Sequence, residues 1–109
     1  MSPRSVCDRL RDVLTAIDRA AAFGTAPRGE MATAAALYEL IVIGEAVGAL
    51  PADVLDAQSR VPKGAVVGMR NLAAHEYHRV NADYVWGTVD DDLPVLRATV
   101  AEELARLEC

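Results

Sequence analysis

The chain has 109 residues, of which 52% are apolar and 25% are charged, and its formal net charge is −5. This length accommodates one domain, residues 1–109, with a single hydrophobic core, and the composition excludes a disordered chain. Only 5% of the residues are aromatic, which favours helices over sheets, and the acidic balance argues against a general polyanion-binding protein.

The first predicted helix runs from about Pro3 to Ala22, with Ser2 as its N-cap. Charged side chains are spread over residues 1–20, so no apolar segment of a signal peptide is present and a cytoplasmic location is expected. Apolar residues recur at steps of three and four along this helix and form one stripe: Val6, Leu10, Val13, Leu14, Ile17 and Ala21.

The second predicted helix spans residues 30–50 and is apolar on nearly every side, so it should be the central and most buried helix. Its length would suit a membrane span, but Glu39 and Glu45 lie inside it. A buried helix of a folded domain is therefore the better interpretation, and no membrane partner is expected. Pro51 ends the helix.

The second half of the chain predicts further helices: a short connecting one over residues 52–60, one from about Ala65 into the segment HEY, and a last helical region over residues 82–107. The segment DDDLP interrupts this last region at Pro94, as either a kink or two abutting helices. Its inward-facing residues are expected to be Val85, Trp86, Val89, Leu93, Leu96, Val100, Leu104 and Leu107. The fold class is thus an all-α, up-and-down bundle of four to five helices.

The two cysteines, Cys7 and Cys109, lie near opposite ends of the sequence. Their spacing matches no metal-binding pattern, and nothing in it indicates a disulfide scaffold. We therefore expect no metal site.

Polar chemistry gathers in the segment RNLAAHEYHRV, residues 70–80, which holds both histidines of the chain. Residues 60–80 carry a net charge of +3, whereas the rest of the chain carries −8. An acidic protein with one basic segment can present a local phosphate site, although a solvated helix end would have the same composition.

Arginine and histidine are the two groups needed to cleave RNA without a metal. Histidine exchanges a proton near neutral pH, and arginine stabilises the charge of the pentacoordinate phosphate. On an ideal helix Arg70 and His75 lie about 140° apart around the axis and about 7.5 Å apart along it. One protomer therefore separates them widely, and a tight site would need a dimer or a distorted helix end.

Simpler roles exist for the same residues. His75 near a helix C-terminus can be only a dipole partner for free carbonyls, and His78 and Arg79 can be solvated surface residues. Glu45, within the apolar segment IVIGEAVG, would need a basic partner from a later helix if it is buried. The alternative is that Glu45 lies on an exposed face.

The string RNLAAHEY resembles the R-x4-H-x-Y signature of HepT-like proteins in the HEPN superfamily, with the match at Arg70, His75 and Tyr77 and with Asn71 after the arginine. The flanking segments LIVIGEA and DYVWGTVDDDLPVL also resemble that family. The resemblance covers about residues 6–107.

The resemblance implies a HEPN-like helical homodimer whose facing motifs form a metal-independent endoribonuclease site. It implies the toxin of a type VII HepT/MNT toxin–antitoxin pair that cleaves RNA, such as tRNA or mRNA, and uses no cofactor. Arg70 and His75 would be catalytic, with Asn71 and Tyr77 in supporting positions. The nucleotidyltransferase antitoxin (MNT) would act by AMPylation of Tyr77 or by complex formation.

Two other functions remain open. The first is a non-catalytic module that binds a nucleotide or the partner protein, which the acidic body of the chain favours. The second is a structural interaction subunit in which only the dimer surface matters.

Overall fold

The computed structural model describes residues 5–55, 68, 71 and 81–109. Within these residues every regular element is helical and no strand occurs, as predicted. Three helical rods are present: α1, α2, and a C-terminal rod made of α4, a π-helical segment and α5. The predicted count of four to five helices stays a prediction, because the other segments lie outside the described residues.

Helix α1 spans Val6–Phe23 and begins three residues later than predicted. Ser5, and not Ser2, is the N-cap: its Oγ accepts a hydrogen bond from the Asp8 backbone N–H at 3.0 Å. The Asp8 carboxylate in turn accepts from the Ser5 N–H at 3.4 Å, which completes a capping box. The predicted apolar stripe faces the core through Leu10, Val13 and Ile17, all of them buried.

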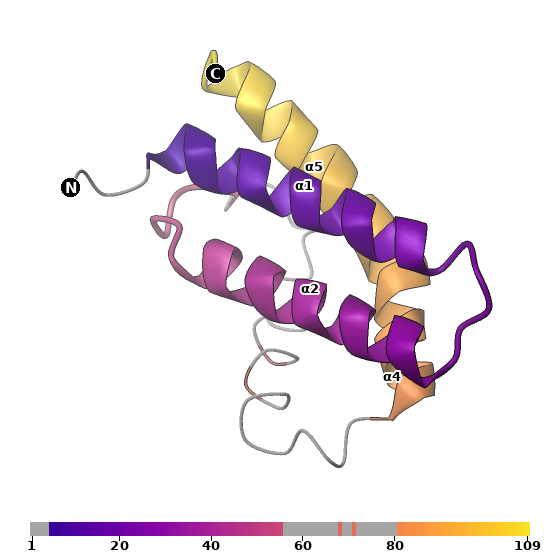
Figure 1. The fold of residues 1–109 in the computed structure, drawn as a ribbon. Coiled ribbons are helices and arrows are strands. Elements are labelled where there is room, and N and C mark those ends of the chain that lie inside the picture. Colours follow the sequence, from indigo (N-terminus) through magenta and orange to yellow (C-terminus); the bar gives the residue numbers. More distant parts are fainter. Residues whose placement is uncertain (1–4, 56–67, 69–70, 72–80) are drawn as a thin grey trace.

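Helix α2 spans Glu30–Gly48 and lies antiparallel to α1, side by side with it (Figure 1). It is long and apolar enough to cross a membrane by length and composition, a test that core helices also pass. Among the described helices α2 has the most buried residues, as predicted, but it is not buried on every side. Leu37, Leu40 and Ile43 are buried, but Met31 is 88% exposed and Tyr38 is 62% exposed.

Residues 51–55 form turns, so the first part of the predicted connecting helix over residues 52–60 is wrong. The Val54 N–H donates to the Pro51 carbonyl at 3.0 Å, and Leu55 adopts a left-handed conformation with φ of 69°. A non-glycine residue in that region cannot continue a right-handed helix. Both Val54 and Leu55 nevertheless bury their side chains in the core, and residues 56–60 lie outside the described residues.

The C-terminal rod consists of α4 (Ala82–Gly87), a π-helical turn (Thr88–Asp92) and α5 (Leu93–Arg106). Its backbone stays helical through both junctions, and the Leu93 N–H bonds to the Thr88 carbonyl, five residues back. The interruption that the sequence predicts at DDDLP is therefore a wide turn within one rod. Because Pro94 has no N–H and its ring crowds the preceding turn, a regular α-helix could not pass through it unchanged.

The core is formed where the C-terminal rod packs across α1 and α2 (Figure 1). The rod contributes six of its eight predicted inward residues as buried side chains, and Leu104 and Leu107 pack half-buried at the edge. Those buried residues are Val85, Trp86, Val89, Leu93, Leu96 and Val100.

Cys7 and Cys109 form a disulfide across a sequence separation of 102 residues, with their Cα atoms 5.8 Å apart. The spacing of the cysteines in the sequence did not indicate this bridge. The bridge joins the first turn of α1 to the segment after α5. Beside it, the Arg11 guanidinium donates to the Cys109 carbonyl at 2.8 Å.

Candidate functional site

The predicted catalytic segment lies largely outside the described residues. Asn71 is described: it has helical backbone conformation, an exposed side chain and an interaction partner. Its placement agrees with a helix in this part of the chain. The roles proposed for the rest of the segment remain predictions, since the following residues are not described: Arg70, His75, Tyr77, His78 and Arg79.

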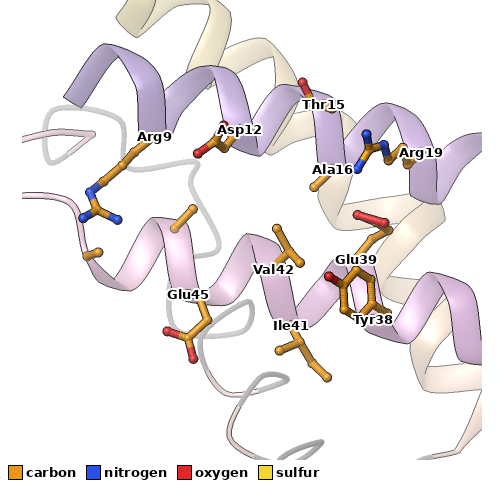
Figure 2. A pocket seen from close by; sticks show the side chains of 12 residues that line it. Arg9, Asp12, Thr15, Ala16, Arg19, Tyr38, Glu39, Ile41, Val42 and Glu45 are labelled. Carbon is orange, nitrogen blue, oxygen red and sulfur yellow. The ribbon is translucent and has the colours of Figure 1, made fainter. Parts of the chain in front are cut away.

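A groove of about 530 Å³ lies between α1 and α2 (Figure 2). Arg9, Asp12 and Arg19 line its α1 side, and Tyr38, Glu39 and Glu45 line its α2 side. The remainder of its lining is Thr15 and a set of apolar side chains: Ala16, Ile41, Val42, Ala46 and Ala49. The groove thus combines an apolar floor with two arginines and one aspartate on α1 and with two glutamates on α2.

Glu39, and not Glu45, is the buried glutamate of α2. Glu39 is 4% exposed, and its Oε1 has no hydrogen-bond partner within the described part of the chain. Glu45 lies on the exposed side of the helix, which corrects the interpretation of it as a buried residue and agrees with the exposed alternative. No functional role of Glu39 was predicted from the sequence.

A second buried glutamate shows how such a group is normally satisfied. Glu103 on α5 is 1% exposed and accepts from the Arg106 Nε at 3.1 Å and from its Nη2. Hydrogen bonding to Glu103 raises the pKa of Arg106 above its ordinary value. Because a buried carboxylate oxygen without a donor is costly, the orphaned oxygen of Glu39 indicates a missing partner.

A cationic corner joins the start of α2 to the C-terminal rod. The Arg28 guanidinium donates two hydrogen bonds to the Asp90 carboxylate, at 2.7 and 2.8 Å, and its Cζ lies 4.4 Å from the centre of the Trp86 ring system. The Trp86 Nε1–H donates to the Thr33 Oγ1 at 3.1 Å. A Cβ on Gly24 would lie 2.9 Å from Arg28 and 3.1 Å from Trp86, so the closeness of this packing depends on glycine.

Ion pairing dominates the electrostatics of this corner. Hydrogen bonding to Arg28 lowers the pKa of Asp90 below its ordinary value of 3.8, and the pair Arg97–Asp18 lowers the pKa of Asp18 in the same way. Since Arg28 already binds a carboxylate, it is not available to a phosphate group. The corner is therefore structural.

A shallow acidic hollow of about 330 Å³ lies on the C-terminal rod, with Asp83, Tyr84, Asp91 and Asp92 in its lining. Within residues 5–55, 68, 71 and 81–109, no three His, Cys, Asp or Glu side chains are grouped so that they could hold a metal ion. The hollow therefore provides neither an anion site nor a metal site.

The sequence matches the model of a known family. The family described as "HepT-like: Ribonuclease HepT-like" matches residues 5–103, so the chain belongs to the HepT-like ribonuclease family. The resemblance stated from the motif RNLAAHEY is thereby confirmed.

Relatives with curated names agree with this assignment. "Putative RNase TTE0752" of Caldanaerobacter subterraneus subsp. tengcongensis is 38% identical over 68% of this chain and 66% of its own length. "Putative RNase MJ0125" of Methanocaldococcus jannaschii is 32% identical over 63% of this chain and 60% of its own length. The matched part thus spans somewhat under two thirds of each relative, and no solved structure matches the chain.

Proposed function

We propose that the chain is a metal-independent endoribonuclease, the toxin of a HepT/MNT toxin–antitoxin pair. The family match over residues 5–103 carries this proposal, and the names of the relatives support the reaction class. The pair Arg70 and His75 supplies the chemistry that such a reaction needs.

In this mechanism His75 transfers protons at the 2′-hydroxyl and at the leaving oxygen of the RNA. Arg70 binds the scissile phosphate and stabilises the additional negative charge of the pentacoordinate state. Asn71 orients the phosphate or His75, and Tyr77 borders the site. Because Arg70 and His75 would lie about 140° apart on an ideal helix, we expect the working site to combine residues from two copies of the chain.

The proposed partner is an MNT-type nucleotidyltransferase antitoxin. Transfer of AMP from ATP to the Tyr77 hydroxyl, with pyrophosphate as the leaving group, would place a phosphate charge and added bulk beside Arg70 and His75. Such a group would occupy the arginine and repel RNA. Inhibition by complex formation alone is the alternative, and an increase in intact mass by one AMP unit distinguishes the two.

The test is cleavage of a labelled tRNA pool by the purified protein in EDTA, compared with His75→Ala. We expect cleavage by the wild type and none by His75→Ala, with the helical circular dichroism spectrum unchanged. His78→Ala is the matched control, because it removes a histidine three residues away and should keep most of the activity. Undiminished cleavage by a folded His75→Ala protein would contradict the assignment.

A non-catalytic nucleotide-binding module is the second candidate, favoured by the net charge of −5. It predicts that the protein binds nucleotide in a manner dependent on Arg70 while the RNA stays intact. The same tRNA experiment therefore separates the two functions.

A further inference from the structure

The Cys7–Cys109 bridge is a covalent feature of the fold that the proposed activity does not use. It joins the first turn of α1 to the segment after α5, where the start of one helix lies near the end of the other (Figure 1). In the cytoplasm, the location predicted from the sequence, small thiols keep most cysteines reduced, and the disulfides that do form are usually transient and redox-sensing. The surroundings of this bridge therefore need to be considered for redox chemistry.

The two ends of the bridge differ in their access to solvent. Cys109 is exposed, whereas Cys7 is half-buried in the first turn of α1. Thiol–disulfide exchange begins when a thiolate attacks one of the two sulfur atoms, and its rate depends on access to that sulfur and on the leaving thiol. An incoming thiol should therefore attack the Cys109 Sγ, which makes Cys7 the leaving group.

The environment of Cys7 suits a leaving thiolate. Cys7 is the second residue of α1, where unpaired backbone N–H groups and the helix dipole favour a negative charge. Arg11 follows one turn later, and its guanidinium donates to the Cys109 carbonyl at 2.8 Å and lies 3.6 Å from the Asp8 carboxylate. The arginine thus offsets the nearby acidic group. Thiolates that form near a helix N-terminus and an arginine are the reactive ones in proteins.

A closed backbone turn holds Cys109 in place after α5. The Glu108 N–H donates to the Ala105 carbonyl at 3.1 Å, and the Cys109 N–H donates to the Leu104 carbonyl at 3.0 Å. This pair of bonds is a Schellman motif. It places Glu108 in the left-handed region, with φ of 56°, which costs energy for a residue other than glycine. The covalent attachment to α1 offsets this cost, so opening the bridge should loosen the turn.

We propose that the Cys109 Sγ is a site of reversible exchange with small thiols of the glutathione class, which makes the bridge a redox-controlled link between α1 and the end of α5. In the first step the thiolate of the small thiol attacks the Cys109 Sγ. A new sulfur–sulfur bond forms there, the bond to the Cys7 Sγ breaks, and Cys7 leaves as a thiolate.

A second molecule of the small thiol completes the reduction. Its thiolate attacks the first molecule within the mixed disulfide and releases Cys109, and the two small thiols leave as their own disulfide. The bridge has then gained two electrons from the two small thiols, and the two cysteines take up the two protons that these thiols lose. The oxidised small thiol closes the bridge again by the reverse steps.

The position of the mixed disulfide tests the site of exchange. The oxidised protein is mixed with reduced glutathione, the reaction is stopped at short times with excess N-ethylmaleimide, and tryptic peptides are analysed by mass spectrometry. We expect glutathione on Cys109 and N-ethylmaleimide on Cys7, with the reverse product about tenfold less abundant. Equal amounts of the two products, or glutathione mainly on Cys7, would overturn the assignment of Cys109.

The redox equilibrium of the bridge tests whether the link is reversible. We expect the bridge to be largely reduced in a glutathione buffer of cytoplasmic composition and to form again in excess oxidised glutathione, with the helical circular dichroism spectrum retained throughout. Alkylation of the free thiols with a maleimide-linked polymer, followed by gel electrophoresis, measures the reduced fraction. A bridge that stays oxidised, or a reduced protein that unfolds, would show a permanent structural cross-link instead.

Glu108→Gly tests whether the turn and the bridge are coupled. Because glycine adopts the left-handed conformation without strain, the variant should need a ratio of squared reduced to oxidised glutathione about fivefold higher than the wild type to open the bridge. Glu108→Gln is the matched control, since it removes the same charge but keeps the strain, and it should open as the wild type does. An unchanged equilibrium in Glu108→Gly would contradict the coupling.

These measurements decide the redox proposal independently of the endoribonuclease assignment. None of them uses RNA or a residue of the segment 70–80, so loss of tRNA cleavage in His75→Ala leaves the redox result unaffected. Conversely, a wild-type protein that cleaves tRNA in EDTA but keeps its bridge in the reducing glutathione buffer would retain the proposed function and overturn the redox link.

Discussion

Arg28 shows how one exposed side chain can connect distant elements. It binds Asp90 with two hydrogen bonds and covers the Trp86 ring, while its Nε donates to the Gly24 carbonyl at 3.1 Å. The side chains of Arg28 and Asp90 are 37% and 49% exposed, so solvent screens the pair and its contribution to stability is small. Its main effect is to fix the segment before α2 against the C-terminal rod.

The hydrogen-bonded guanidinium of Arg28 lowers the pKa of Asp90. Replacing Arg28 by glutamine should therefore raise that pKa toward its ordinary value of 3.8. The pKa of Asp90 is depressed in the folded state, so the ion pair stabilises the folded protein fully at pH values above that ordinary pKa. This stabilisation is lost as the pH falls through the depressed pKa. A carboxyl-carbon NMR titration of Asp90 in both proteins measures the shift.

Asp18 is the internal control of that titration, since it pairs with Arg97 at 2.8 Å and should titrate identically in both proteins. The stability advantage of the wild type over Arg28→Gln should also disappear in acid. An Asp90 pKa that does not move in the variant would contradict the assigned cause.

Glu39 and Glu45 of α2 mark a limit of prediction at the scale of single residues. A helix with apolar residues on all sides has no polar face from which its orientation could be predicted. The sequence therefore identifies α2 as a core helix but cannot decide which of Glu39 and Glu45 turns inward. That choice depends on where α1 and the C-terminal rod pack.

At the scale of the helix, the start of α1 depends on which serine caps it. Ser2 followed by Pro3 and Ser5 followed by Asp8 are both plausible N-terminal signals, and the structure selects Ser5. Only Ser5 has an acidic residue at the third helical position, which makes the cap reciprocal. The pair Ser5 and Asp8 is visible in the sequence, but Pro3 favoured Ser2 as the predicted N-cap.

Ser5→Ala should lower the free energy of unfolding by about 1 kcal/mol, because it leaves a backbone N–H at the helix start without its acceptor. Ser2→Ala is the matched control and should change it by less than about 0.5 kcal/mol, as expected of a substitution away from such features. Urea unfolding followed by circular dichroism measures both. An equal loss in Ser2→Ala would mean that the helix begins at Pro3.

The C-terminal rod shows what composition can and cannot predict about an element. The cluster DDDLP correctly locates the irregularity, since proline cannot occupy the interior of a regular α-helix without cost. Whether the chain then ends the helix or widens one turn depends on tertiary packing. Here Leu93 and Leu96 are buried on either side of Pro94, and a continuous rod keeps both in the core.

At the scale of the whole molecule, the helical class and the positions of the long helices follow from apolar periodicity. The disulfide does not, because nothing local brings together two residues that are 102 positions apart. Their proximity results from α1 and α5 packing with the end of one near the start of the other. The antiparallel placement of α1 and α2 agrees with the predicted up-and-down bundle, but the sequence does not predict which side chains line the groove between them.

Reduction of the Cys7–Cys109 bridge should lower the melting temperature of the protein. In the chain-entropy model, closing a loop of this length stabilises the folded state by about 4–5 kcal/mol, less any strain in the native bridge. Thermal unfolding with and without dithiothreitol measures the effect. The double variant Cys7→Ser, Cys109→Ser should melt near the reduced wild type and should not respond to dithiothreitol.

The bridge also changes the topology of the polypeptide, because residues 7–109 become a covalent ring. A single proteolytic cut between α1 and α2 would open this ring without separating any helix from the rest, and the fragments would part only after reduction. A stretching force applied at the two cysteines would be carried by the sulfur–sulfur bond, so the helical core would bear no load. For the same reason, new chain ends could be introduced between α1 and α2, with a short peptide joining the original ends in place of the bridge.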